Sequence, residues 1–184
     1  WESSADIAVG LTGDRQMWEW GTIGYAFFPT SGGNDFNRAD LGSLLGQSFN
    51  AANYAHPEGD IFLDNYDNSY DYLDPGGFGI SVILHEIGHA LGLKHPDESG
   101  GAGFPTFAQL GISDLDLDQY TVMSYDVAFP NYYDGNPETP MVLDILAIQY
   151  IYGANMTYHS ADDVYQFVGG RVYAIWDAGG NDTI

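Results

Sequence analysis

Residues 85–95 read HEIGHALGLKH and contain three of the five histidines of the chain. On a helix, His85 and His89 lie one turn apart and point to the same side. Gly92 can adopt a positive φ and reverse the chain, which would bring His95 back to the same point in space. The window therefore predicts a helix that ends at Gly92, followed by a return of the chain toward that helix.

Imidazoles that converge in this way can bind one metal ion. Three protein ligands leave a position open for a water molecule, as catalytic zinc sites do, and Glu86 could reach that water. The chain has no cysteine, so a transition metal must be bound by histidine and oxygen ligands. The complete pattern HExxHxxGxxH is much more specific than HExxH alone and predicts a catalytic zinc site with ligands His85, His89 and His95.

The rest of the sequence favours one α+β domain, since 184 residues with 45% hydrophobic content are sufficient for a core. Alternating apolar residues predict strands at residues 6–11, 22–28 and 59–64. Apolar residues at helical spacing predict helices at residues 38–53, 80–91 and 140–152. Stretches rich in Gly, Pro, Asn and Asp predict loops at residues 67–79 and 94–118.

The charge of the chain is strongly negative, with 26 acidic residues against 4 basic ones and a net charge of −22. Such a charge repels nucleic acid and anionic membrane surfaces, so nucleic acid is not an expected partner. The sequence also lacks an uninterrupted run of 18 apolar residues, which argues against insertion into a membrane. Divalent cations would relieve the repulsion among the carboxylates.

A second motif, VMSY at residues 122–125, gives the histidine window a wider context. The two together resemble the metzincin clan of zinc endopeptidases, in which a Met-turn passes beneath the metal. Within that clan the chain resembles the serralysin family. This resemblance covers most of the chain and rests on the segments ADIAVGL, GYAFFP, GLKHP, MSY, DILAIQYIYGAN and WDAGGNDTI.

The resemblance implies a metzincin-type zinc peptidase domain over residues 1–155, with a mixed twisted sheet, an active-site helix and a Met-turn. It implies that the N-terminal strand and long helix of the family are missing from this chain. It makes Glu86 the general base and Met123 the hydrophobic floor beneath the zinc site. Tyr125 matches the family tyrosine that can ligate the resting metal and then hydrogen-bond the reacting substrate.

The C-terminal residues 156–184 resemble the beginning of the calcium-binding β-roll, an RTX-like segment, and the chain is truncated there. Asp177, Gly179 and Asp182 match the family segment WDxGGxD, and oxygen ligands of this kind suit Ca²⁺. The full set of residues that the resemblance implies for this calcium site is Asp163, Asp177, Gly179 and Asp182, with the backbone carbonyls of His159 and Ala161.

The implied function is a secreted, extracellular zinc endopeptidase that hydrolyses peptide bonds of proteins through a zinc-activated water, with Glu86 as general base. A monomer is expected, with protein or peptide substrates in a cleft bordered by an edge strand, which the resemblance places at residues 59–64. One alternative is a non-catalytic calcium- or matrix-binding module that retains a zinc site, although such a relic needs neither Glu86 nor Tyr125. Matrixin-like or astacin-like peptidases are further alternatives, disfavoured by MSY and GLKHP respectively.

Overall fold

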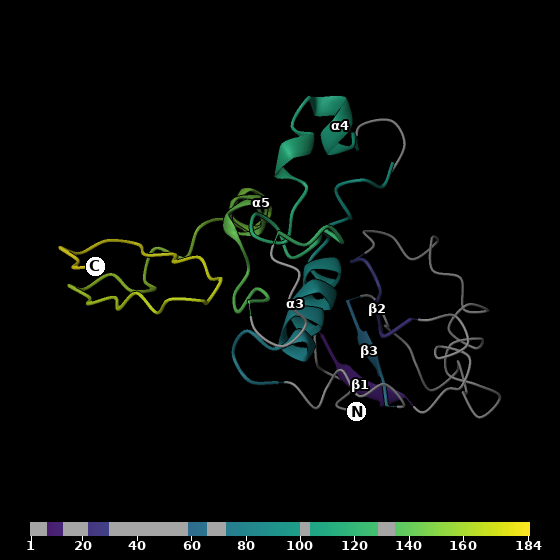
Figure 1. Cartoon of the computed structure of the whole chain (residues 1–184), viewed down its shortest axis with the longest axis horizontal. Coiled ribbons are helices and arrows are strands. Elements are labelled where there is room, and N and C mark those ends of the chain that lie inside the picture. Colours follow the sequence, from purple (N-terminus) through teal and green to yellow (C-terminus); the bar gives the residue numbers. More distant parts are fainter. Residues whose placement is uncertain (1–6, 13–21, 30–58, 66–72, 100–103, 129–134) are drawn as a thin grey trace.

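The computed structural model describes residues 7–12, 22–29, 59–65, 73–99, 104–128 and 135–184. The helix predicted at residues 38–53 lies outside these ranges. In the described part, a small sheet packs against helix α3 (Phe78–Ala90), while α5 (Val142–Tyr152) lies on the other side of α3 in Figure 1. The segment after α5 extends away from both (Figure 1). This mixture of one sheet with helices agrees with the predicted α+β class.

The described sheet contains three strands in the order β1-β3-β2, namely β1 (Val9–Thr12), β2 (Gly24–Ala26) and β3 (Ile61–Asp64). β1 pairs with β3 in parallel, and β2 pairs with β3 in the antiparallel direction, so the sheet is mixed as expected. β2 and β3 lie inside their predicted ranges, and β1 extends one residue past its predicted end at residue 11.

The expectation that residues 59–64 form an edge strand is wrong. β3 is the middle strand, with β1 on one side and β2 on the other. All four of its residues are buried, because a strand that is flanked on both sides and covered by a helix has no free face or edge. The antiparallel strand β2 lies at one edge of the described sheet instead, and it is the strand with the most contacts to α3.

Helix α3 begins at Phe78, before the predicted start at residue 80, and its last residue is Ala90. Gly92 has a φ of +98°, the left-handed conformation that the sequence required of it. The N–H groups of Gly92 and Leu93 donate to carbonyls of the last helical turn and close the helix. The chain then turns back toward α3, as predicted.

Two small cores hold α3 in place. The first lies between α3 and the sheet and contains Ala26, Ile61, Leu63, Ala90, Ile83 and Ile87. The second lies beneath the histidine window and contains Val122, Met123, Met141, Leu84, Leu93, Val172 and Ala174. At the centre of this second core, a Cβ on Gly88 would lie 2.3 Å from the sulfur of Met123. The absence of a side chain at residue 88 therefore lets the methionine pack directly on the helix.

The predicted loop at residues 94–118 contains two short helices, α4 (Phe107–Leu110) and a 3₁₀ turn at Ser113–Leu115. A capping box starts α4, because the Thr106 hydroxyl accepts from the N–H of Gln109 and the Gln109 side chain accepts from the N–H of Thr106. The sequence TFAQ carries this signal, and the Gly- and Pro-rich composition around it obscured it.

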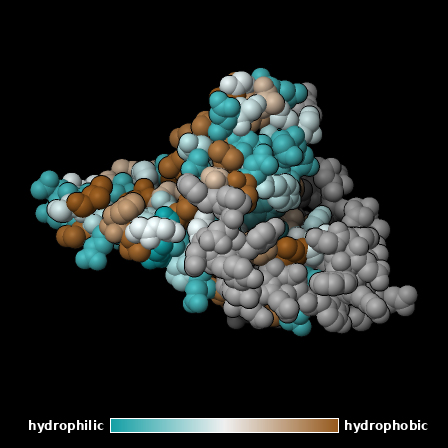
Figure 2. Space-filling model, in the orientation of Figure 1, coloured by the Kyte–Doolittle hydropathy of each residue, from teal (hydrophilic) through white to brown (hydrophobic). Residues whose placement is uncertain are grey.

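Outside the three strands, the described residues form two isolated parallel bridges, Pro137 with Val172 and Val164 with Thr183. Residues 164–168 and 171–176, which alternate apolar and polar side chains in part, therefore do not form longer strands. Val164, Phe167 and Val168 are exposed, whereas Val172 and Ala174 pack against the second core. Figure 2 shows hydrophobic side chains on the surface of the extended end of the molecule. Among the helices that the structure describes, each is too short or too polar to cross a membrane.

Candidate metal centre

The three histidines of the window converge on one point. His85 and His89 come from the last turns of α3, and His95 comes from the returning segment. The Nε2 atom of His95 lies 3.1 Å from Nε2 of His85 and 3.0 Å from Nε2 of His89. The structure thus brings together the side chains that the sequence assigned to one metal.

The other ring nitrogen of the two helical histidines is held by a backbone carbonyl. Nδ1 of His85 lies 2.7 Å from the carbonyl oxygen of Val122, and Nδ1 of His89 lies 2.8 Å from that of Leu93. A carbonyl oxygen only accepts hydrogen bonds, so both Nδ1 atoms carry the proton and donate it. In a neutral ring Nε2 is then a bare lone pair that faces the other two rings.

The distances and the donor chemistry fit a zinc ion. Bare nitrogen lone pairs about 3 Å apart repel one another unless a proton or a cation lies between them. Two nitrogens that each lie about 2.0–2.1 Å from a tetrahedral zinc are about 3.3 Å apart, close to the separations found here. Imidazole nitrogen is also a ligand type that zinc prefers.

Electrostatics keeps the two helical rings in the form that binds a metal. Burial lowers the pKa of His85 and of His89 to about 4, although each Nδ1 hydrogen bond opposes this, and the neighbouring histidines lower both values further. Both rings are therefore neutral near pH 7. Metal ligation requires neutral imidazole, so these rings do not have to lose a proton before binding.

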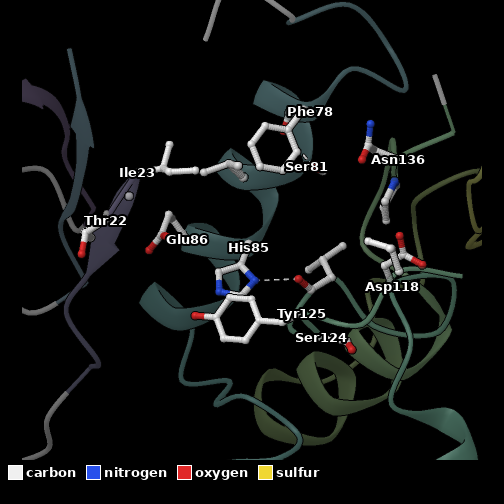
Figure 3. Close-up of a pocket in the computed structure, with 15 residues that line it drawn as sticks. Thr22, Ile23, Phe78, Ser81, His85, Glu86, Asp118, Ser124, Tyr125 and Asn136 are labelled. Carbon is white, nitrogen blue, oxygen red and sulfur yellow. Dashed lines mark hydrogen bonds between the residues drawn. The ribbon is translucent and has the colours of Figure 1, made fainter. Parts of the chain in front are cut away.

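Glu86 lies beside this cluster, with only 5% of its surface exposed. Burial raises the pKa of its carboxyl to about 8. One oxygen, Oε1, presses against strand β2, where a Cβ on Gly24 would lie 2.7 Å away. The other oxygen, Oε2, is the one buried side-chain polar atom that lacks a hydrogen-bond partner among the described residues. Such an atom is costly to bury, and its residue, Glu86, lines the cavity in Figure 3.

Tyr125 adds a phenol hydroxyl to the histidine cluster. Its hydroxyl lies 2.9 Å from Nε2 of His95, and its ring lies 4.6 Å from the imidazole ring of His95. The side chain is 70% exposed, so it is free to rotate toward solvent. Burial of the hydroxyl raises the pKa of Tyr125, and the nearby carboxylates, Glu86 first, raise it further. The hydroxyl therefore keeps its proton at neutral pH.

A cavity of about 350 Å³ opens beside His85, Glu86 and Tyr125 (Figure 3). Its walls come from β2, from α3, from the segment around Met123 and from residues 136–137. Most of the lining is apolar, with a few polar groups, including Ser81 and Asn136. A pocket of this composition suits a side chain of a bound ligand.

The segment beneath the histidines is fixed by Asp144 of α5, a residue that the sequence analysis did not identify. Its buried carboxylate accepts from the hydroxyl of Thr121 at 2.6 Å, and from the backbone N–H groups of Val122 and Met141 at 2.8 Å each. Burial raises the pKa of Asp144, and the three donors oppose this. Because the carbonyl of Val122 orients His85, Asp144 supports a candidate metal ligand from below.

A second group of possible ligands lies in the C-terminal segment. Carboxylate oxygens of Asp163, Asp177 and Asp182 all lie within 4.8 Å of one another. The backbone N–H of Asp163 donates to Asp182, that of Gly179 donates to Asp177, and a ring nitrogen of His159 lies 3.1 Å from the Asp163 carboxylate. A Cβ on Gly180 would lie 2.1 Å from the carbonyl oxygen of Ala161. The two segments that contain the candidate calcium ligands, residues 159–163 and 177–182, are thus in contact.

Comparison with known proteins places these features in a family. The family model Peptidase_M10, described as matrixin, matches residues 16–126. Serralysin of Proteus mirabilis is 39% identical over 129 residues, covering 59% of this chain and 26% of that protein. Serralysin C of Dickeya chrysanthemi is 32% identical over 186 aligned positions, covering 90% of this chain and 33% of its own length. Metalloprotease AprA of Pseudomonas entomophila is 37% identical over 133 residues, covering 59% of this chain and 27% of that protein. The chain therefore spans a third or less of these relatives.

Proposed function

The chain belongs to the M10 (matrixin) peptidase family and is a serralysin-like metzincin within it, and on this premise we propose that it is a zinc endopeptidase that cleaves peptide bonds of proteins. Zinc is the metal of the serralysin-type metalloproteases, and the histidine triad could bind it. The observation that supports the proposal most strongly is the convergence of three Nε2 atoms on one point, next in sequence to Glu86, whose buried Oε2 has no hydrogen-bond partner among the described residues.

In this proposal His85, His89 and His95 hold the metal through Nε2. When bound, zinc acts as a Lewis acid that polarises the scissile carbonyl and lowers the pKa of a water to ~7. A cation held by the histidines would lower the pKa of the neighbouring Glu86 carboxyl from the value that burial sets. As a carboxylate, Glu86 would accept the proton of the attacking water and pass it to the leaving nitrogen. General acid–base catalysis of this kind typically contributes ~10²–10⁴-fold to the rate.

Tyr125 has two roles in the proposal. In the resting site its hydroxyl lies against the histidine cluster, where it can serve as an additional ligand. Its exposed side chain can then rotate and donate a hydrogen bond to the oxyanion that develops on the substrate carbonyl. Met123 supports the cluster from below through its packing on Gly88.

The substrate would be an extended peptide in a cleft along β2. This strand lies at an edge of the described sheet and presses against Glu86 through Gly24. A peptide held in this cleft through its main chain would be recognised with little dependence on its side chains, which favours broad specificity. One of its side chains would enter the cavity beside His85. This strand replaces residues 59–64 as the proposed border of the cleft.

We further propose that residues 1–155 act as the catalytic domain and residues 156–184 as the first part of a calcium-binding β-roll. Asp163, Asp177 and Asp182 would supply carboxylate ligands to Ca²⁺, in line with their separations. Gly179, with the carbonyls of His159 and Ala161, would complete the turns. Secretion as an extracellular monomer is proposed from the similarity to the serralysins.

Metal removal tests the proposal. The chain is incubated with casein before and after treatment with 1,10-phenanthroline, and then after addition of one equivalent of zinc. We expect cleavage at the start, loss of cleavage with the chelator and its return with zinc. Cleavage that continues without zinc would exclude this mechanism. A zinc-loaded chain that cleaves neither casein nor a peptide panel would favour the non-catalytic module instead.

A further inference from the structure

The third histidine of the cluster is held differently from the other two. His85 and His89 donate from Nδ1 to backbone carbonyls, which are groups that every residue possesses. His95 instead has Nδ1 3.2 Å from the Oε2 atom of Glu98. This partner is a side chain and a carboxylate, so its contribution depends on the identity of one residue.

The turn that presents Glu98 is closed by backbone bonds and by a lysine. The N–H of Glu98 donates to the carbonyl of His95 at 3.3 Å. The ammonium group of Lys94 donates to the same carbonyl at 3.0 Å and to the carbonyl of Glu98 at 2.7 Å. Lys94 is one of only four basic residues in the chain, and it ties together the two ends of the turn that carries the third ligand.

We propose that Glu98 is a positioning residue for His95, held in place by Lys94. Oε2 of Glu98 lies within ion-pair distance of Nδ1, and a carboxylate there favours the tautomer that carries its proton on Nδ1 and leaves Nε2 as the bare ligand atom. It also fixes the ring angle and makes Nε2 a stronger donor to a metal. The inference rests on the proposed function, because it assumes that zinc is the ion that the three histidines hold.

His95 has more need of such a partner than the other ligands. His85 and His89 are on a helix that packs against the sheet, whereas His95 follows the end of that helix in a segment without regular structure. The ring of His95 contacts Tyr125, and the proposed catalytic cycle moves that tyrosine. Glu98 keeps the ring in place when Tyr125 leaves. Partners of this kind typically change metal affinity by about 10–100-fold when they are removed.

Zinc affinity of the whole chain tests the proposal independently of cleavage. It is measured by competition with a chromophoric chelator for the parent, E98A, E98Q and D97A, after circular dichroism has shown that each variant is folded. Asp97 is the matched control, because it is exposed and lies in the same turn, so D97A removes an equal charge without removing the partner of His95. We expect about 10–100-fold weaker binding in E98A, a smaller loss in E98Q, whose amide oxygen still accepts, and less than a twofold change in D97A.

The visible spectrum of the Co²⁺-substituted protein gives a second readout. In E98A it should shift from that of the parent, since the ligand geometry at His95 changes, while in D97A it should not. Zinc affinity in E98A within twofold of the parent, or an equal loss in D97A, would overturn the proposal. A parent that binds zinc tightly and cleaves nothing, together with a weakened E98A, would support Glu98 while overturning the proposed peptidase activity. A parent that binds no zinc would overturn both.

Discussion

The two groups of candidate metal ligands in the described part of this chain are built in opposite ways. Two of the three histidines, His85 and His89, lie on a helix that packs against the sheet. Their rings are neutral, and Nδ1 of each is bonded to a carbonyl. The aspartate cluster lies in the C-terminal segment, where Val164 and Phe167 are largely exposed and the described strand pairing consists of isolated bridges. The three carboxylates of this cluster carry like charges, and their oxygen atoms lie within 4.8 Å of one another.

The difference shows which site the fold forms by itself. Neutral rings held by carbonyls and a buried aspartate are already arranged for a metal, so zinc would add activity to an existing structure. Three carboxylates that repel one another gain much more from a cation. We therefore expect calcium to control the order and stability of residues 156–184, and zinc to control catalysis.

The largest expected effect comes from removing one ligand of each cluster in turn. H89A should weaken zinc binding by about 10³-fold or more, since structural zinc sites with a few ligands are worth roughly 10–16 kcal/mol in total. D182N should leave zinc affinity unchanged. Both variants are compared with the parent by chelator competition. A large loss in D182N would mean that the two regions are not independent.

Calcium should have the next largest effect, and it should act on stability. At about a hundred times its dissociation constant, a ligand that binds only the folded state stabilises it by about 2.7 kcal/mol. The thermal midpoint of the parent should therefore rise when Ca²⁺ is added to the chelator-treated protein. D182N should show little of this rise and keep its zinc content. A D182N protein that gains as much as the parent would rule out the assigned calcium ligands.

A smaller effect is expected beneath the histidines. D144N keeps the size of the buried side chain but places an amide NH₂ against groups that donate to the carboxylate, so it should destabilise the chain by about 1–3 kcal/mol. It should also weaken zinc binding, because Val122 orients His85. The exposed Asp114 provides the control D114N. Urea unfolding gives the free energy, and equal values for D144N and D114N would contradict the support role of Asp144.

Local patterns were the most predictable part of this molecule. The helix around residues 80–91 and the positive φ of Gly92 follow from spacing within eleven residues, and the structure confirms both. The position of a strand in its sheet depends on residues far away in the sequence. Strand β3 contacts β1, about fifty residues earlier, and nothing in its own residues distinguishes a middle strand from an edge strand with certainty. This is why residues 59–64 were wrongly expected to form an edge strand.

The supporting residues of the site escaped sequence analysis for the same reason. Asp144 accepts hydrogen bonds from residues that precede it by more than twenty positions. In the sequence, only its position in the first turn of α5 indicated that its carboxylate could accept from backbone N–H groups. Glu98 is close to His95 in sequence, but its contact depends on the turn that Lys94 closes. Ligands form a recognisable pattern, whereas the groups that orient them are set by the fold.

Cleavage of casein by the zinc-loaded parent and by zinc-loaded E86Q tests the central claim most directly. The substitution keeps the shape of Glu86 and removes its ability to take a proton, and zinc content is measured for both proteins. The account predicts equal zinc content and a cleavage rate in E86Q that is lower by ~10²–10⁴-fold. Equal rates for the two proteins at equal zinc content would contradict it.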